Sequence, residues 1–401
     1  MTDVDGFRGE LVEFLEHELP KQLGGSPPPT GDYWGGRNPE LPHPASRRYC
    51  EVMAERGLTA PTWPKEYGGG ALDKEQAKIL AAELRRLELP APLVGFGLSM
   101  IGPTLLQFGS DAQKREHLPK IVRGEIRWAQ GYSEPNAGSD LASLQASARI
   151  VGDELFINGQ KIWTSYADKA DWMFGIFRTD SGGKKQEGIT FLLLDMAQPG
   201  VEVRPIKLIS GASPFCETFF TDARAHTRDI IHGVGNGWTV AKALLGHERT
   251  MIGDLFGAGA GARNRTAAGN PLAELAREYL GDRDGQIADP VLRDRVALFS
   301  MDERCFALTM QRSADSLKAG HKPGPESSIF KIYGTELNQR RQELMLSLRG
   351  PQCLGWEGTG FDERELAQAR DWLRSRGNTI EGGTSEVQLN IIAKHVLGLP
   401  D

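Results

Sequence analysis

The spacing of apolar residues changes twice along this chain of 401 residues. Up to about residue 127 apolar side chains recur at helical spacing, and afterwards they form short apolar or alternating runs separated by Gly, Asp and Pro. Helical spacing returns near residue 236. This order predicts an α+β fold with segregated elements, which comprises an N-terminal helical domain (1–127), a middle β-domain (128–235) and a C-terminal helical domain (236–401).

Local signals predict individual elements inside these three regions. Asp73, followed three residues later by Gln76, is typical of a capping box that opens a helix, and three leucines then fall on one face of that helix: Leu80, Leu84 and Leu87. Strands are expected at 146–151, 154–159, 171–179, 189–195 and 201–206. Later helices are expected at 236–255, 293–317, 328–348 and 385–397.

Composition narrows the class of protein. The chain is 39% hydrophobic and 25% charged with a net charge of −6, which is typical of a folded soluble protein and gives no reason to expect nucleic acid as a partner. No apolar run approaches the roughly 20 residues that span a bilayer, and the acidic N-terminus lacks the order of a signal peptide, so we expect a cytoplasmic protein. The four cysteines form no CxxC pair and the histidines form no HExxH, so no metal site is expected.

The segment GYSEPNAGSDLASL at 131–144 combines hydroxyl side chains with glycines where helical spacing gives way to strands. Such a loop can direct backbone N–H groups and hydroxyls at a flavin ring edge or a phosphate. Taken alone, the segment is better explained as an ordinary polar turn.

The segment NGQKIWTSYADKADW at 158–172 begins with Asn158–Gly159, which is typical of a tight turn. Trp163 and Ser165 then pair a flat apolar ring with a hydroxyl donor one strand alternation away. The simpler alternative is a hairpin that contributes a core tryptophan.

The segment NTIEGGTSEVQLN at 378–390 places two glycines before Thr384. The glycines allow a close approach of the backbone to a ligand, and Thr384 or Ser385 can cap the last helix. A helix N-cap after a turn is again the simpler alternative.

Together these segments resemble the acyl-CoA dehydrogenase family. The resemblance follows the family's order over most of the chain: WPKEYGGGA (63–71), SEPNAGSD (133–140), NGQKIWTS (158–165) and GGTSEVQLNIIAKHVLG (382–398). It implies an N-terminal helical domain, a middle β-domain and a C-terminal four-helix bundle. It also implies FAD as cofactor, bound between the middle and C-terminal domains with its adenine end reaching another subunit.

The resemblance assigns cofactor contacts in the middle domain. Gln130, Tyr132 and Ser133 match positions along the flavin ring. Trp163 matches the residue that stacks near the isoalloxazine, and Ser165 matches the hydroxyl that faces N5.

Five further cofactor contacts follow from the same resemblance. Ser139 matches the loop serine near the phosphates of FAD or acyl-CoA. Gln352 and Gly355 match a segment that binds the FAD of a neighbouring subunit, and Thr384 and Glu386 match the C-terminal FAD contacts.

The catalytic base is expected at an unusual place. Many family members carry a glutamate directly before the Gly-Thr of the last motif, but here Gly382 occupies that position and Glu381 comes one residue early. This form resembles isovaleryl-type members, whose base lies on an earlier helix at the position of Glu248, which Arg249 follows. Glu248 is therefore the expected base, with Arg249 and Gly382 at the substrate. Glu381 remains the alternative base, and a solvated acid on a helix face remains the alternative interpretation of Glu248.

Two further segments affect the interpretation. GAGAGA at 257–262 satisfies a loose dinucleotide-binding pattern, but it is expected to continue the Glu248 helix and no buried strand precedes it. We therefore expect its small residues to make room for a bulky acyl group. The segment 270–287 does not reproduce the family's Arg-x-x-Phe-Gly stretch, which holds FAD pyrophosphate across a dimer. A heteromeric arrangement with a related chain is therefore open.

The resemblance implies desaturation of an acyl-CoA thioester between its α and β carbons. Electron-transfer flavoprotein or a similar acceptor would reoxidise the flavin, and the chain would form a dimer, a tetramer or a heterotetramer with a related chain. An acyl-CoA oxidase that uses O2 and a non-catalytic binding subunit are the rival functions.

Overall fold

The computed structural model describes residues 4–245, 270–320, 324 and 328–400. These residues form two compact units. The first contains residues 4–206 and 214–245, and the second contains residues 207–213 and those from 270 onward. The three expected domain boundaries remain predictions, and each unit is described on its own terms below.

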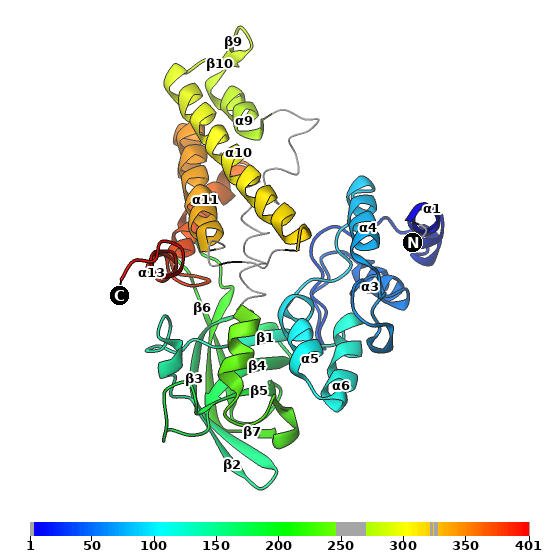
Figure 1. Cartoon of the computed structure of the whole chain (residues 1–401). Helices are drawn as coiled ribbons and strands as arrows, with labels where there is room; N and C mark the ends of the chain where they lie inside the picture. The colour runs from blue at the N-terminus through cyan, green and yellow to red at the C-terminus, as the bar shows by residue number, and fades with distance from the viewer. Residues whose placement is uncertain (1–3, 246–269, 321–323, 325–327, 401) are drawn as a thin grey trace. The chain divides into compact units, whose positions relative to one another are not determined.

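Helices build the first part of unit 1 (Figure 1). They are α1 (Val4–Glu13), α2 (Leu19–Gln22), α3 (Ser46–Glu55), α4 (Lys74–Arg86), α5 (Gly102–Phe108) and α6 (Asp111–Val122). The predicted capping box is confirmed, because the Asp73 carboxylate accepts the N–H groups of Glu75 and Gln76 and the Gln76 side chain accepts the N–H of Asp73. The predicted leucine face is also confirmed, since all three leucines pack into one apolar cluster with α1 and α3.

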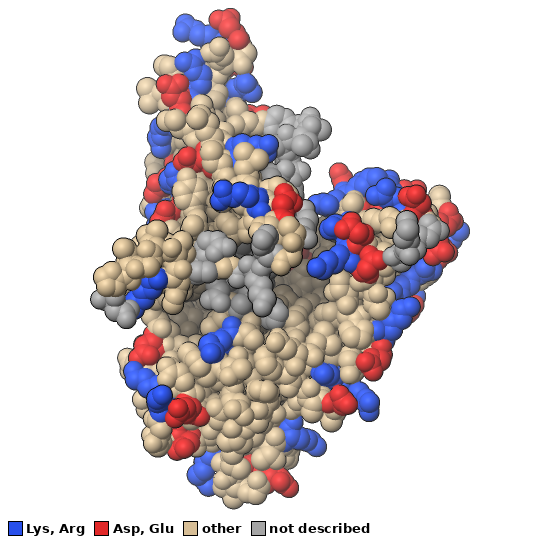
Figure 2. All heavy atoms as spheres, in the orientation of Figure 1, with Lys and Arg blue, Asp and Glu red and all other residues tan. Residues whose placement is uncertain are grey.

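Exposed ion pairs also join this helical part, but they contribute little to its stability. Arg86 lies 2.6 Å from Glu16, and Arg56 pairs with Glu18. Figure 2 shows basic and acidic side chains intermixed over this part of the surface. Because exposed pairs of this kind contribute about 0–1 kcal/mol each, the apolar cluster beneath them is the main source of stability.

An eight-stranded sheet forms the second part of unit 1. The strands are β1 (Trp128–Gly131), β2 (Ser147–Val151), β3 (Glu154–Ser165), β4 (Trp172–Arg178), β5 (Ile189–Asp195), β6 (Val201–Ile206), β7 (Phe215–His226) and β8 (Ile230–Ile231). The order across the sheet is β6-β7-β3-β2-β4-β5-β8, and β1 pairs with β4 in parallel. All five strand regions expected from the sequence are strands, and the α+β fold class is confirmed.

Asn158–Gly159 does not form the expected hairpin turn. The pair lies inside β3, where the register against β7 shifts between Ile157 and Gly159. Gly159 has φ +134°, and a Cβ there would lie 2.7 Å from the Cα of Ala146. The Asn158 side chain exchanges two hydrogen bonds with Asp222, at 2.9 and 3.0 Å. The signal that is typical of a turn is therefore used for a β-bulge, since both need a glycine with positive φ.

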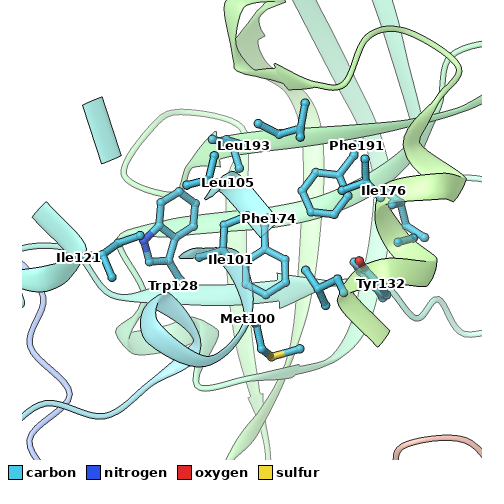
Figure 3. Close-up of a cluster of buried hydrophobic side chains, with 14 of the residues drawn as sticks. Met100, Ile101, Leu105, Ile121, Trp128, Tyr132, Phe174, Ile176, Phe191 and Leu193 are labelled. Atoms are coloured by element: carbon cyan, nitrogen blue, oxygen red, sulfur yellow. The ribbon is translucent and has the colours of Figure 1, made fainter. Parts of the chain in front are cut away.

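The helices and the sheet of unit 1 share one apolar core (Figure 3). Side chains of the helical part meet side chains of β1, β4 and β5 there, and a helical stretch at 237–245 adds Val240, Ala241 and Leu244. The Phe174 and Phe191 rings stack with their planes 7° apart. The core members labelled in the close-up are Met100, Ile101, Leu105, Ile121, Trp128, Tyr132, Phe174, Ile176, Phe191 and Leu193. This core fixes the end of β1, from which the loop at 131–140 leaves.

Unit 2 is mainly helical. It contains α9 (Pro271–Leu280), α10 (Pro290–Lys318), α11 (Ser328–Arg349), α12 (Glu363–Ser375) and α13 (Ser385–His395), with a two-residue ribbon of β9 (Asp282–Arg283) and β10 (Gln286–Ile287). The other four helices all contact α11. Helices α10, α11 and α13 match predicted regions, whereas α9 and α12 are additional to those that the sequence pattern indicates.

His117 on α6 is an unusual member of the unit 1 core. Its side chain is 2% exposed, and its ring lies edge-on to those of Trp128 and Trp172, with centroids 5.4 and 4.9 Å apart. Burial lowers the pKa of His117 to about 4. The unfolded chain, with an ordinary imidazole pKa near 6.5, binds this proton first as the pH falls.

We expect His117 to make the protein acid-sensitive between pH 6.5 and 4. Its stabilising contribution is complete above pH 6.5 and is lost as the pH falls toward 4, with a slope of up to about 1.4 kcal/mol per pH unit. His117→Phe keeps a buried ring without a titrating group, so its thermal midpoint should fall less steeply over this range. The exposed His17→Gln is the control and should follow the wild type. Parallel curves for wild type and His117→Phe, followed by circular dichroism, would contradict the prediction.

Candidate functional site

Strand β1 and the loop after it carry three of the predicted residues, Gln130, Tyr132 and Ser133. Tyr132 is 5% exposed, and its ring lies edge-on to those of Phe174 and Phe191 in the core. Ser133 is half-buried, and Glu134 is buried behind it. Gln130 is half-buried on β1 itself, opposite Phe174 of β4. Tyr132 thus anchors the loop to the core, whereas Ser133, the next residue, is partly exposed to solvent.

A buried ion pair lies beneath this loop. The Lys161 Nζ, which has no exposed side-chain surface, lies 2.8 Å from the Glu134 carboxylate and also donates to the Tyr132 carbonyl at 3.1 Å. The two carboxylate oxygens of Glu134 accept the backbone N–H groups of Gln145 and Ala146, at 2.6 and 2.9 Å. Burial lowers the pKa of Lys161 to about 8, and the Glu134 charge opposes that fall.

The end of β3 departs from regular strand geometry at Trp163. The register against β7 shifts between Lys161 and Thr164, and Trp163 has φ +60°. Its side chain is 50% exposed, so the alternative of a core tryptophan is wrong. The bulge breaks the alternation that would otherwise direct Trp163 and Ser165 to the same face. Positive φ in a bulky residue is rare and is often associated with functional sites.

The loop and the strand end are joined directly. The Ile162 N–H donates to the Ser133 carbonyl at 2.8 Å, so Ser133 is held next to the residue that precedes Trp163. Thr164 is buried and donates to the Cys216 carbonyl at 2.7 Å, which leaves Trp163 and half-buried Ser165 on either side of a fixed residue. Ser139, in contrast, is exposed on the far part of the loop.

This arrangement fits a flavin. A half-exposed indole offers a flat face for stacking, and partly exposed hydroxyls nearby can donate hydrogen bonds to ring atoms. Tyr132, Ser133, Trp163 and Ser165 are thus brought together by unit 1. Sequence reasoning missed Glu134 and Lys161, although both stand inside the two motifs that it singled out.

The second group of predicted residues lies in unit 2, around the turn that precedes α13. Gly382 and Gly383 have φ +64° and +90°, which side-chain-bearing residues rarely adopt. Thr384 caps α13, since its hydroxyl accepts the Val387 N–H at 3.1 Å, and this confirms the predicted cap. Glu386 is exposed in the first turn of that helix.

Gln388 is a residue of this turn that the sequence analysis missed. It is 2% exposed, and its Nε2 donates to the Gly382 carbonyl at 3.2 Å. A Cβ at Gly383 would lie 2.6 Å from that nitrogen, so the glycine is needed for this approach. Its place one helical turn after Thr384 is the signal that could have indicated it.

Glu381, the alternative base, is already engaged. One carboxylate oxygen accepts from Arg374 at 2.7 Å, and the other accepts from the Asn378 side chain. The buried Lys331 Nζ donates to the carbonyls of Asn378 and Thr379, at 3.0 and 3.4 Å, and burial lowers its pKa. Glu381 is therefore part of the network that holds the turn.

Gln352 and Gly355 lie in a different segment of unit 2. Gln352 is exposed in the short 3-10 helix Gly350–Leu354, and Gly355 is buried directly after it. A Cβ at Gly355 would lie 2.5 Å from the Phe361 ring, so close packing alone requires glycine there. Helix α12 contacts both this segment and the short helix Arg376–Thr379 before the glycine turn.

Glu248 and Arg249 lie outside the described residues, as does the segment 257–262. Among the residues that are described, no helix is long and apolar enough to cross a membrane. Within the same residues, no group of three His, Cys, Asp or Glu side chains is arranged to hold a metal ion.

Comparisons with known proteins match almost the whole chain. The N-terminal, middle and C-terminal domains of acyl-CoA dehydrogenase match residues 10–125, 129–223 and 235–397. The acyl-CoA dehydrogenase IpdE1 of Mycolicibacterium smegmatis is 35% identical over 418 residues, which cover 100% of this chain and 99% of that protein. IpdE1 of Mycobacterium tuberculosis is also 35% identical, over 408 residues with the same coverage of both chains.

Solved structures of similar fold also match nearly the whole chain. A steroid ACAD, Tcur3481-Tcur3483, has a TM-score of 0.75 at 26% identity and covers 99% of this chain and 96% of its own. The ChsE4-ChsE5 complex of Mycobacterium tuberculosis has a TM-score of 0.71 at 26% identity, with 100% and 98% covered. Three matching domains and relatives of full length identify the chain as a member of the acyl-CoA dehydrogenase family, an oxidoreductase whose cofactor is FAD.

Proposed function

We propose that this enzyme desaturates the acyl group of an acyl-CoA thioester between its α and β carbons. The observation that carries the proposal is the surface at the end of β3, where Trp163 is half-exposed. The Ile162 N–H, one residue before Trp163, binds the Ser133 carbonyl, and Ser165 lies two residues after Trp163. We assign Trp163 to stacking on the flavin ring, and Ser133 and Ser165 to hydrogen bonds with its edge. FAD, when bound there, supplies the acceptor for the hydride that leaves the β carbon.

Glu248 is the residue that we propose as the base for the α-proton. The position directly before Gly383–Thr384, where a base is common in the family, holds Gly382. Glu381 is a poor substitute because both its carboxylate oxygens accept hydrogen bonds, from Arg374 and from Asn378. A general base needs a carboxylate oxygen that is free to take a proton.

Gly382 and Arg249 are proposed at the substrate. The Gly382 carbonyl is held by Gln388, which fixes the direction of this peptide segment. A Gly382 N–H directed at the thioester carbonyl would stabilise the negative charge that develops on that oxygen as the α-proton leaves. Ser139 is proposed to lie near the phosphates of FAD or acyl-CoA, and Thr384 and Glu386 are proposed as further FAD contacts.

A bulky, ring-bearing acyl group is the substrate class that we propose. Two observations support it: one structural neighbour is described as a steroid ACAD, and the sequence carries a run of small residues at 257–262. Small side chains leave room for a large ligand where larger ones would fill it.

The assembly is proposed to be an oligomer. Gln352 is exposed, and Leu354, two residues later, is 79% exposed, so this segment is available to a neighbouring subunit. One structural neighbour is the ChsE4-ChsE5 complex, and this makes a heterotetramer with a related chain as reasonable as a homo-oligomer. Electron-transfer flavoprotein is the proposed electron acceptor.

Purified protein is expected to carry FAD and to lose its flavin absorbance when an acyl-CoA is added without oxygen. A panel of straight, branched and ring-bearing acyl-CoAs should reduce the flavin at different rates, with ring-bearing thioesters fastest. An oxygen-uptake measurement separates a dehydrogenase from an oxidase, which would turn over with O2 alone. A colourless protein that takes up no FAD, either alone or with a related chain, would refute the assignment.

The assignment of the base predicts opposite outcomes for two conservative variants. Glu248→Gln keeps the shape but not the basicity of the side chain, so FAD should remain bound while flavin reduction by substrate slows by about 10⁴-fold, the upper end of the usual range for a general base. Glu381→Gln keeps the shape of the side chain and one of the two hydrogen bonds that it accepts, so flavin reduction should slow by less than about tenfold. Anaerobic stopped-flow measurement of flavin reduction in both variants, with one substrate, tests the assignment. If Glu381→Gln slows reduction far more than Glu248→Gln does, Glu381 is the base.

A further inference from the structure

Four parts of unit 1 converge on the buried charges of Glu134 and Lys161. Glu134 belongs to the loop after β1 and accepts the N–H groups of Gln145 and Ala146 just before β2. Lys161 belongs to β3, and its Nζ lies 5.1 Å from the centroid of the Phe177 ring on β4. One ion pair of 2.8 Å therefore ties together elements that are up to 43 residues apart in sequence.

The ion pair lies where the ordinary ladder of the sheet is interrupted. Lys161 pairs with Thr218 of β7 and Thr164 pairs with Cys216, so the two residues between them have no partner in that ladder. The first of them, Ile162, binds the loop instead, because its N–H donates to the Ser133 carbonyl. The preceding carbonyl, that of Tyr132, accepts from the Lys161 Nζ. Two consecutive loop carbonyls are thus bound by two consecutive residues of β3.

We propose that Glu134 and Lys161 are a positioning pair, which sets Ser133 against Trp163 and Ser165 so that the flavin-facing residues are presented together. The inference rests on the proposed function of these three residues. Both charged heads are buried, so they act through the backbone of the loop and of β3. Burying two charges is rarely a gain in stability over an apolar pair of the same volume, which leaves the fixing of one backbone arrangement as the role of the charges.

The deciding variant removes both charges at once. Glu134→Gln with Lys161→Met keeps side-chain volume and leaves no unpaired charge in the interior, and the one amide oxygen of the glutamine can still accept from one of the two N–H groups at 145 and 146. We expect this double variant to fold and to bind FAD, with a thermal midpoint below that of the wild type because the Tyr132 carbonyl and one backbone N–H lose their partners. Lys161→Met alone leaves the Glu134 carboxylate buried without its cation, so it should melt earlier than the double variant.

The readout is flavin chemistry rather than stability. In the double variant the limiting rate of flavin reduction at saturating acyl-CoA should fall about 10- to 100-fold, because displacement of catalytic groups by about 1 Å has effects of this size. The substrate concentration for half-maximal rate should change little, and the visible absorbance bands of the bound flavin should shift. Lys185→Met is the matched control, since it removes the exposed pair with Asp140 on the same loop and should leave rate and spectrum unchanged.

Each outcome has a defined meaning. A double variant that binds FAD with the spectrum and limiting rate of the wild type overturns the positioning role. If the double variant does not hold FAD, Glu134→Asp is the deciding variant, because it keeps the charge but is too short to bind Lys161 and both amides. A limiting rate of flavin reduction equal to that of the wild type overturns the inference, and a reduced rate with bound FAD supports it. A wild-type protein that no acyl-CoA reduces would instead contradict the proposed function itself.

Discussion

A charged group can remain in a protein interior only while its partners stay in place, and Lys161 imposes this condition on one end of the sheet. Its ammonium needs the Glu134 carboxylate and the Tyr132 carbonyl, and Glu134 in turn needs the amides before β2. If the loop moved away, two buried charges would lose their hydrogen bonds together. This requirement keeps the loop against a strand whose own ladder is broken at Trp163.

Unit 2 uses a buried lysine in a related way. Lys331 is 4% exposed, and its ammonium donates to the carbonyls of Asn378 and Thr379, at the start of the turn that carries Gly382. Here no carboxylate contacts the ammonium within the described residues, and Glu381 acts on it only through its charge. In both units, therefore, a buried ammonium binds backbone carbonyls of a segment that carries predicted site residues. Irregular backbone of this kind needs such partners because it lacks the hydrogen bonds of a helix or a ladder.

The hydrogen bonds that Glu381 accepts affect which residue can act as the catalytic base. A carboxylate between Arg374 and Asn378 stabilises the turn, and the turn presents Gly382 with a backbone conformation that needs glycine. The residue next to the usual position of the base thus has a structural role that competes with catalysis. This is the physical argument for placing the base on another helix, as we propose for Glu248.

The sequence by itself determined the fold class, the capping box at Asp73, the strand regions and the family, because these depend on local periodicity, local hydrogen bonds and contiguous motifs. It also indicated Trp163, but it could not decide between a core and an exposed side chain. That depended on the bulge after Lys161, which only pairing with β7 creates. The partnership of Glu134 with Lys161 and the engagement of Glu381 by Arg374 were likewise decided by tertiary structure, since side chains 27 and 7 residues apart meet only when separate elements pack together.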